Sequence, residues 1–132
     1  MANLRTEGER FATLSSSEKA QSALYVRNEL DTFDSAQVAD LLAYYVPALL
    51  AELERPCDAG DSERAVTHKM VLLVLNSVEH MRHDNPKMYP LLPRIGEVLA
   101  AIIDRENEEN TALILRMATD LIYLVSVSFQ HD

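Results

Sequence analysis

The sequence predicts an all-α protein: a HEAT/armadillo-like α-solenoid of about five helices, which makes two and a half repeats. Three observations favour this class. Leu and Ala are abundant, whereas Gly and Pro number only 3 and 5 in 132 residues, which suits helices better than turn-rich sheets. Apolar residues recur at spacings of three and four along most of the chain. Similar segments recur after about 45 residues, a period typical of two-helix repeats.

The N-terminal part divides into a polar segment and a first helix. Residues 1–16 contain few apolar side chains, so we expect a flexible N-terminal segment without an element anchored in the core. A helical pattern begins at Ser17 and should end near Asp31. Residues 17–132 are therefore assigned to the HEAT-like helical domain.

The next two helices are separated by a loop. Asp34 or Ser35 is the expected N-cap of the second helix, and Pro47 inside that helix should kink it. Residues 55–62 combine Pro, Gly and Asp and are expected to form an exposed loop. A third helix with a wide apolar face follows over residues 63–81.

The last two helices meet at an acidic stretch. The fourth helix is expected from Pro86, with Pro90 and Pro93 bending or delaying its start. Residues 104–109 hold four carboxylates and lead into the apolar fifth helix. Acids before and within a first helical turn are favoured by capping and by the helix dipole, so we assign them to a helix start and not to a cation site.

The repeat leaves the fifth helix without a cap. Ser17, Ser62 and Asn107 stand 45 residues apart, each as a capping residue before Glu, and residues 46–50 are echoed by 89–92. A solenoid that ends in mid-repeat leaves an apolar face open to a partner, a second copy or further repeats. The alternative is that the helices close into a compact bundle. The interaction residues predicted from this helix are Leu113, Met117, Leu121, Leu124, Val125 and Phe129.

Composition restricts the partners and the compartment. The net charge of −9 disfavours direct binding to nucleic acid or to anionic lipid. Cys57 is the single cysteine, which suits a reducing cytosol or nucleus. The N-terminus lacks the apolar core of a signal peptide, and no apolar run approaches the length of a membrane span. We therefore expect an intracellular protein that is not secreted and has no membrane partner.

No catalytic motif occurs in the chain. There is no nucleophile elbow, phosphate-binding glycine loop or HExxH sequence, so we expect no enzyme activity, no cofactor and no catalytic residue. The main His-containing cluster consists of Glu79, His80, His83 and Asp84. It is the basis of one hypothesis of function, a metal-dependent helical enzyme. A solvated helix end explains these residues better, and we expect no metal site.

The acidic joint carries a resemblance to a known family. Glu106, Asn107, Glu108, Glu109 and Asn110, followed by the helical segment 112–117, resemble the N-terminal HEAT region of the TRRAP family, the giant pseudokinase scaffolds of histone-acetyltransferase coactivator complexes. The resemblance covers residues 36–122, and only the joint is specific. It implies a structural role for these five joint residues.

The resemblance also implies a function. A chain like this family would be a non-catalytic, nuclear scaffold segment that binds other proteins, such as subunits of a coactivator complex or the rest of a larger HEAT solenoid. The alternative is a small stand-alone helical adaptor or regulatory subunit in the cytoplasm or nucleus, homodimeric through its last helix.

Overall fold

The computed structural model describes residues 3–55, 62–80, 88 and 90–130, with the side chain of residue 80 and those beyond Tyr123 outside the description. All regular elements in these ranges are helical, which confirms the all-α class for the described chain. The five expected helices are present, the second of them as two consecutive elements, and one short N-terminal helix is added. The helices are α1 (Leu4–Arg10), α2 (Ser16–Glu29), α3 (Ser35–Asp40), α4 (Val46–Glu54), α5 (Ser62–His80), α6 (Leu91–Ile102) and α7 (Glu108–Gln130).

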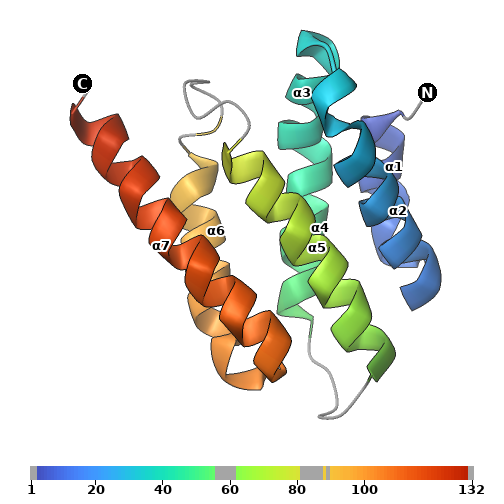
Figure 1. The fold of residues 1–132 in the computed structure, drawn as a ribbon. Coiled ribbons are helices and arrows are strands. Elements are labelled where there is room, and N and C mark those ends of the chain that lie inside the picture. The colour runs from blue at the N-terminus through green and yellow to red at the C-terminus, as the bar shows by residue number, and fades with distance from the viewer. Residues whose placement is uncertain (1–2, 56–61, 81–87, 89, 131–132) are drawn as a thin grey trace.

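The helices form two layers. In one layer α5 lies between α2 and α7, and in the other α4 lies between α1 and α6 (Figure 1). The core fills the space between the layers and consists of buried aliphatic side chains from every helix, such as Val26, Leu49, Leu72, Ile95 and Met117. When α3 and α4, which join end to end, are taken as one helix, consecutive helices alternate between the layers.

The N-terminal segment contributes to the core, so the expectation that it anchors nothing there is wrong. Leu4 of α1 and Phe11, in the 3₁₀ turn Phe11–Thr13 that follows, are both buried. Gly8 permits this packing, because a Cβ at this position would lie 2.4 Å from the backbone oxygen of Tyr44. Two large apolar residues and one glycine are enough to anchor a short helix that makes such a close approach.

The predicted second helix runs through its proline. Asp34 is the N-cap and forms a capping box with Gln37. Between α3 and α4 the chain makes a π-helical turn, Leu41–Tyr45, immediately before Pro47. Proline cannot donate to the carbonyl four residues earlier and its ring crowds that carbonyl, so a wider turn at this point lets the helix continue.

The joined helix corrects one expectation about length. Ser35–Glu54 spans 20 residues with mean hydropathy 1.2, so by length and composition alone it is long and apolar enough to cross a membrane. Half of it is buried inside the fold, as core helices often are, and a single helix of this kind among the described residues is weak evidence for a span. The helix was predicted over this span, but polar residues in its first turns make its apolar character less evident from the sequence.

The remaining helix starts differ slightly from the expected ones. The N-cap of α2 is Ser15, which forms a capping box with Glu18, so Ser17 lies inside the helix and is not a cap. Helix α6 begins after Pro90, later than the predicted start at Pro86, and Pro86 lies outside the described residues. A 3₁₀ turn, η4 (Ile103–Arg105), then precedes α7.

Tyr45 connects three elements near the N-terminus. Its ring is fully buried and packs edge-on against Phe11, with 5.7 Å between the ring centroids. Its hydroxyl lies 2.8 Å from the Ser22 hydroxyl of α2. Burial raises the pKa of Tyr45 to about 12, so the hydroxyl stays protonated and available for this bond.

A buried ion pair joins the two layers. Lys19 Nζ of α2 donates to both carboxylate oxygens of Glu52 in α4, at 2.6 and 2.9 Å, and both side chains are almost fully buried. Arg55 Nη1 approaches the same two oxygens at 2.9 and 3.0 Å. Arg64 of α5 donates in turn to the backbone oxygen of Arg55.

The two helical glycines give a matched test of packing. Gly8→Ala should destabilise the protein by about 2 kcal/mol, because the added methyl group meets backbone atoms of Tyr44. Gly96→Ala, where nothing lies within 4 Å of the added Cβ, should stabilise it by about 0.5 kcal/mol. Urea unfolding followed by circular dichroism measures both values. Equal effects of the two variants would contradict the close approach of α1.

The ion pair predicts a non-additive mutant cycle. Lys19→Met should destabilise the protein by about 3 kcal/mol, because Glu52 keeps its buried charge with only a half-exposed arginine beside it. The double variant Lys19→Met/Glu52→Met should recover most of that loss. Additive losses in urea unfolding would show that the pair has no energetic coupling.

Candidate functional site

A buried polar network lies where α5 meets the acidic joint. His68 of α5 is fully buried, and its Nδ1 lies 2.9 Å from Glu106 Oε1. Arg64 Nε donates to His68 Nε2 at 3.1 Å. Because Nε2 accepts this bond, the proton of a neutral imidazole is on Nδ1 and is donated to Glu106.

The joint residues complete this network. The side-chain oxygen of Asn107 accepts a hydrogen bond from the backbone N–H of Asn110 at 2.8 Å, as the side chain of an N-cap does. The Asn110 side chain donates to Glu106 and to the backbone oxygen of Ala65 in α5, at 3.2 and 3.1 Å. Glu108 and Glu109 form the exposed first turn of α7. The acidic stretch thus lies at a helix start, and Glu106 and Asn110 also attach that start to α5.

The electrostatics of Glu106 fit a structural role. Burial acts to raise the pKa of Glu106, but the hydrogen bond and charge of His68, the Asn110 bond and the charge of Arg105 outweigh it and hold this pKa below its usual value. The carboxylate is therefore ionised at neutral pH. Both nitrogens of His68 are used in hydrogen bonds, so neither is open to accept a proton from a substrate.

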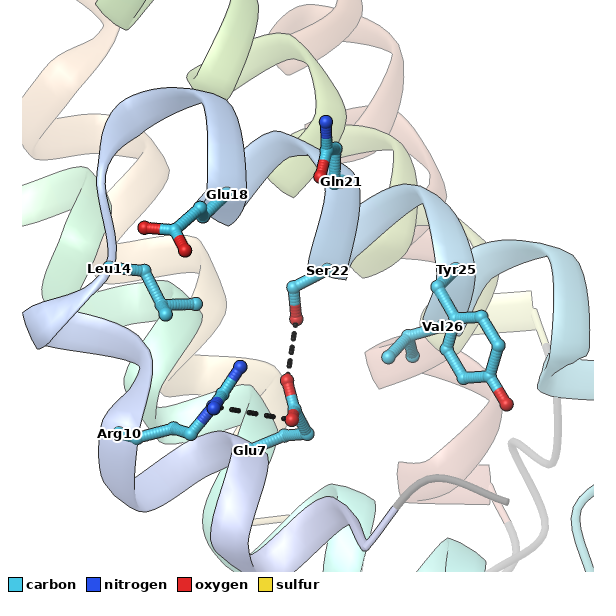
Figure 2. Close-up of a pocket in the computed structure, with 8 residues that line it drawn as sticks. All are labelled: Glu7, Arg10, Leu14, Glu18, Gln21, Ser22, Tyr25 and Val26. Atoms are coloured by element: carbon cyan, nitrogen blue, oxygen red, sulfur yellow. Dashed lines mark hydrogen bonds and ion pairs between the residues drawn. The ribbon is translucent and has the colours of Figure 1, made fainter.

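A groove opens between α1 and α2. It has a volume of about 440 Å³ and is lined by Glu7, Arg10, Leu14, Glu18, Gln21, Ser22, Tyr25 and Val26. Figure 2 shows Ser22 directed toward Glu7 across the groove, where its hydroxyl donates at 3.3 Å, while Arg10 pairs with Glu7 at 3.3 Å. The polar groups in its centre bond to one another, which leaves a shallow surface without a converging set of reactive groups.

A second groove lies between α5 and α7. It has a volume of about 410 Å³ and is lined by Lys69, Leu73, Glu109, Ala112, Leu113 and Arg116. Lys69 and Glu109 form an ion pair of 2.6 Å at one end. The apolar floor and charged rim are those of a helix–helix contact.

The predicted interaction residues of the last helix divide into two groups. Met117 and Leu121 are buried, and Leu113 is partly buried against the core, so the expectation that these three residues meet a partner is corrected. Their spacing of four residues places them on the face of α7 that packs on the fold. The other three lie outside the described side chains: Leu124, Val125 and Phe129.

The exposed apolar residues of α7 lie on another face. Leu115, Ile122 and Tyr123 are 55%, 70% and 68% exposed. Leu115 and Ile122 are seven residues apart, two helical turns, and so share one side of the helix. The sequence contained this signal in its spacing, but an apolar stripe does not say by itself which side of a helix faces the core.

The His-containing cluster at the end of α5 lies only partly within the described residues. Glu79 is buried, whereas His83 and Asp84 and the side chain of His80 lie outside the described residues. Within the described part of the chain, no group of three or more His, Cys, Asp or Glu side chains is arranged to hold a metal ion. Cys57 also lies outside that part.

Comparison with known proteins gives no relative. The chain matches no protein-family model, no curated protein and no solved structure.

The His68–Glu106 pair predicts a pH-dependent stability difference. Glu106→Gln keeps the shape but removes the charge, and should destabilise the protein by about 1–2 kcal/mol at pH 7. Because the folded-state pKa of Glu106 is depressed, its contribution is present above the ordinary value of 4.5 and is lost as the pH falls through the folded-state pKa. The difference from wild type in urea unfolding should therefore shrink from pH 7 to pH 3.

Glu97→Gln is the control for this measurement. Glu97 is exposed on α6, so its replacement should change the free energy of unfolding by less than about 0.5 kcal/mol. A Glu106→Gln effect as small as that of the control would mean that the buried bond contributes nothing.

Proposed function

We propose that this chain is a non-catalytic segment of a helical-repeat scaffold that works by binding other proteins. One observation carries the proposal. Helix α7 covers one face of α5. The face of α7 at the corresponding helix positions is not covered by any described element.

The equivalence follows from the helix starts. On α5, Ala65 accepts the bond from Asn110, Lys69 pairs with Glu109, and Leu73 lines the groove beside Leu113, so these three α5 residues face α7. The first residues that the structure gives to the two helices, Ser62 and Glu108, lie 46 residues apart, one more than the period of 45 taken from the sequence. Aligned on these residues, three residues of α7 take the corresponding positions: Thr111, Leu115 and Thr119. Leu115 and Thr119 are exposed and Thr111 is half-buried.

This arrangement is what a solenoid segment requires. In a helical-repeat protein each repeat contacts its neighbours, and a terminal repeat without a polar cap leaves its outer face available. Leu115 is exposed, although the corresponding position of α5 is covered by α7. A following helix would therefore pack on α7 at Leu115. We therefore propose that a helix from another protein, or from further repeats, lies along Leu115 and Thr119.

The resemblance of the joint supplies the class of scaffold. The segment Glu106–Asn110 resembles the TRRAP-family HEAT region, and by that resemblance the partners are subunits of a histone-acetyltransferase coactivator complex or the rest of a larger HEAT solenoid in the nucleus. This assignment rests on sequence resemblance alone.

The same face supports a second candidate function. A stand-alone helical adaptor would pair two copies of α7 through Leu115, because closed two-fold dimers are the commonest way to cover an exposed helix face. The two functions differ in what binds to the same residues, so one set of variants tests both.

The double variant Leu115→Glu/Thr119→Glu tests the face. Two carboxylates on this face should weaken partner binding by at least about tenfold in affinity, because the charged groups would be buried without partners. The measurement is a pull-down of the tagged protein from its source cells at near-physiological salt, read by quantitative mass spectrometry, with light scattering of the purified protein.

Leu24→Glu is the matched control, because Leu24 is an exposed leucine on α2, in the same layer. Recovery of histone-acetyltransferase subunits by wild type and Leu24→Glu, but not by the double variant, supports the scaffold. A dimer of wild type that the double variant converts to monomer supports the adaptor. Binding that survives in the double variant but is lost in Leu24→Glu would place the interface elsewhere and reject both.

A further inference from the structure

The groove between α5 and α7 has apolar side chains that are accessible to solvent. The two helices lie side by side and run in the same direction (Figure 1). Lys69 and Glu109 form their ion pair at one end of the groove, and Leu73 and Leu113 follow one turn later on the two helices. Both leucines are half-buried, so each of them shows part of its surface to solvent. The groove therefore offers an apolar contact next to a charged end.

The apolar surface continues along α5. Val66 and Met70 precede Leu73 by seven and three residues, a spacing that places the three side chains on one side of the helix. Val66 is 57% exposed and Met70 is half-buried. Residues seven apart in a helix are separated by about 10 Å, which is about two turns. An amphipathic helix that binds in a groove uses apolar anchors at this spacing.

Arg116 gives the other end of the groove a positive charge. It lines the groove seven residues after Glu109, two turns further along α7. Its guanidinium is exposed and makes no hydrogen bond or ion pair with any residue that the structure describes. Asp120, one turn later, is not a lining residue and acts on Glu79. The lining side chains carry two positive charges and one negative charge, although the net charge of the chain is −9.

The groove between α1 and α2 differs in its charged groups. Arg10 and Glu7 form an ion pair, and Glu18 accepts a bond from the backbone of Ser15. Each charged side chain that lines that groove is therefore already bonded within the fold. Only the groove between α5 and α7 combines an apolar floor with a charged group that is available to a ligand.

We propose that the groove between α5 and α7 binds an amphipathic helix of another protein, with a carboxylate near its apolar anchors. The anchors contact Leu73 and Leu113 and extend along α5 to Val66. The carboxylate pairs with the Arg116 guanidinium, whose planar array of donors suits bidentate binding. Lys69 can exchange its bond to Glu109 for a second acid, because an exposed ion pair contributes little.

This site is separate from the face proposed for the next repeat. A helix turns by about 100° per residue, so Leu115 points away from Leu113, which lines the groove. A partner in the groove and a helix on Leu115 therefore use different sides of α7. The inference goes beyond the scaffold proposal, because it gives the chain a binding site for an acidic helical segment whether or not further repeats follow.

Selection from a peptide library tests the site on the purified, full chain. A phage-displayed library of random peptides of about 16 residues, which is four to five helical turns, is selected on the immobilised protein. The enriched peptides are synthesised, and their affinities are measured by fluorescence anisotropy. We expect them to combine apolar residues at helical spacing with Asp or Glu, and to gain helix content on binding, as read by circular dichroism.

Two exposed residues are replaced to test the two parts of the site. Arg116→Glu should weaken peptide binding by at least about tenfold, because it places a like charge opposite the peptide's carboxylate. Val66→Glu should weaken it by a similar factor, because a charge would lie in the apolar contact.

Two variants serve as controls. Arg27→Glu replaces an exposed arginine of α2 outside the groove and changes the net charge by the same amount as Arg116→Glu. Leu115→Glu replaces the exposed leucine on the other side of α7. Both should bind the peptides within about twofold of wild type, as surface substitutions outside a contact do.

A charge exchange completes the test. Replacement of the peptide's acid by Lys should weaken its binding to wild type and strengthen its binding to Arg116→Glu by at least about tenfold. The proposal is overturned if no enriched peptide binds, if Arg116→Glu or Val66→Glu binds as wild type does, or if Arg27→Glu weakens binding as much as Arg116→Glu. Because Leu115→Glu distinguishes the two sides of α7, the failure of the scaffold proposal and that of this one are separate results.

Discussion

The two layers of this fold depend on a buried charge pair. Lys19 and Glu52 lie in different layers, and neither is tolerable in the interior without the other. Their contact fixes the position of α2 over the end of α4, and Arg55 and Arg64 extend it to the beginning of α5. Aliphatic contacts have no preferred direction, whereas the hydrogen bonds of the ion pair do, so the pair adds a directional contact between the layers. The ion pair gives the interface one position.

In the layer of α2, α5 and α7, a side chain of each later helix donates to a backbone oxygen of the helix before it. Thr67 of α5 donates to the backbone oxygen of Ser16 in α2, and Asn110 of α7 donates to that of Ala65 in α5. Both acceptors lie in the first turns of their helices. The two contacts differ in register, because Thr67 is the sixth residue of α5 whereas Asn110 is the third residue of α7, so the two neighbours of α5 are staggered differently along it.

Local patterns were enough to predict the helices, because periodicity, caps and prolines act over a few residues. Asp34 and Asn107 are caps as expected. Helix α1 was missed because its anchoring depends on the space that Gly8 leaves beside Tyr44, 36 residues further along the chain. The buried contact of His68 is equally beyond local patterns, since its partner Glu106 lies 38 residues away.

The candidate binding face shows the same limit. The apolar periodicity of the last helix was recognised, but it has two apolar sides, and the sequence does not distinguish the side that faces the core. Met117 and Leu121 belong to the core side and Leu115 to the outer one. The choice is made by the position of α5 and α6, which are separate parts of the chain.

The edge-on packing of Tyr45 against Phe11 has a spectroscopic consequence. The protein contains no tryptophan and five tyrosines, so its near-ultraviolet circular dichroism arises largely from tyrosine rings. A ring held rigidly in an asymmetric site gives a strong signal, whereas a largely exposed ring such as that of Tyr25 contributes less. The near-ultraviolet spectrum therefore reports on the docking of α1 separately from the total helix content, without any added label.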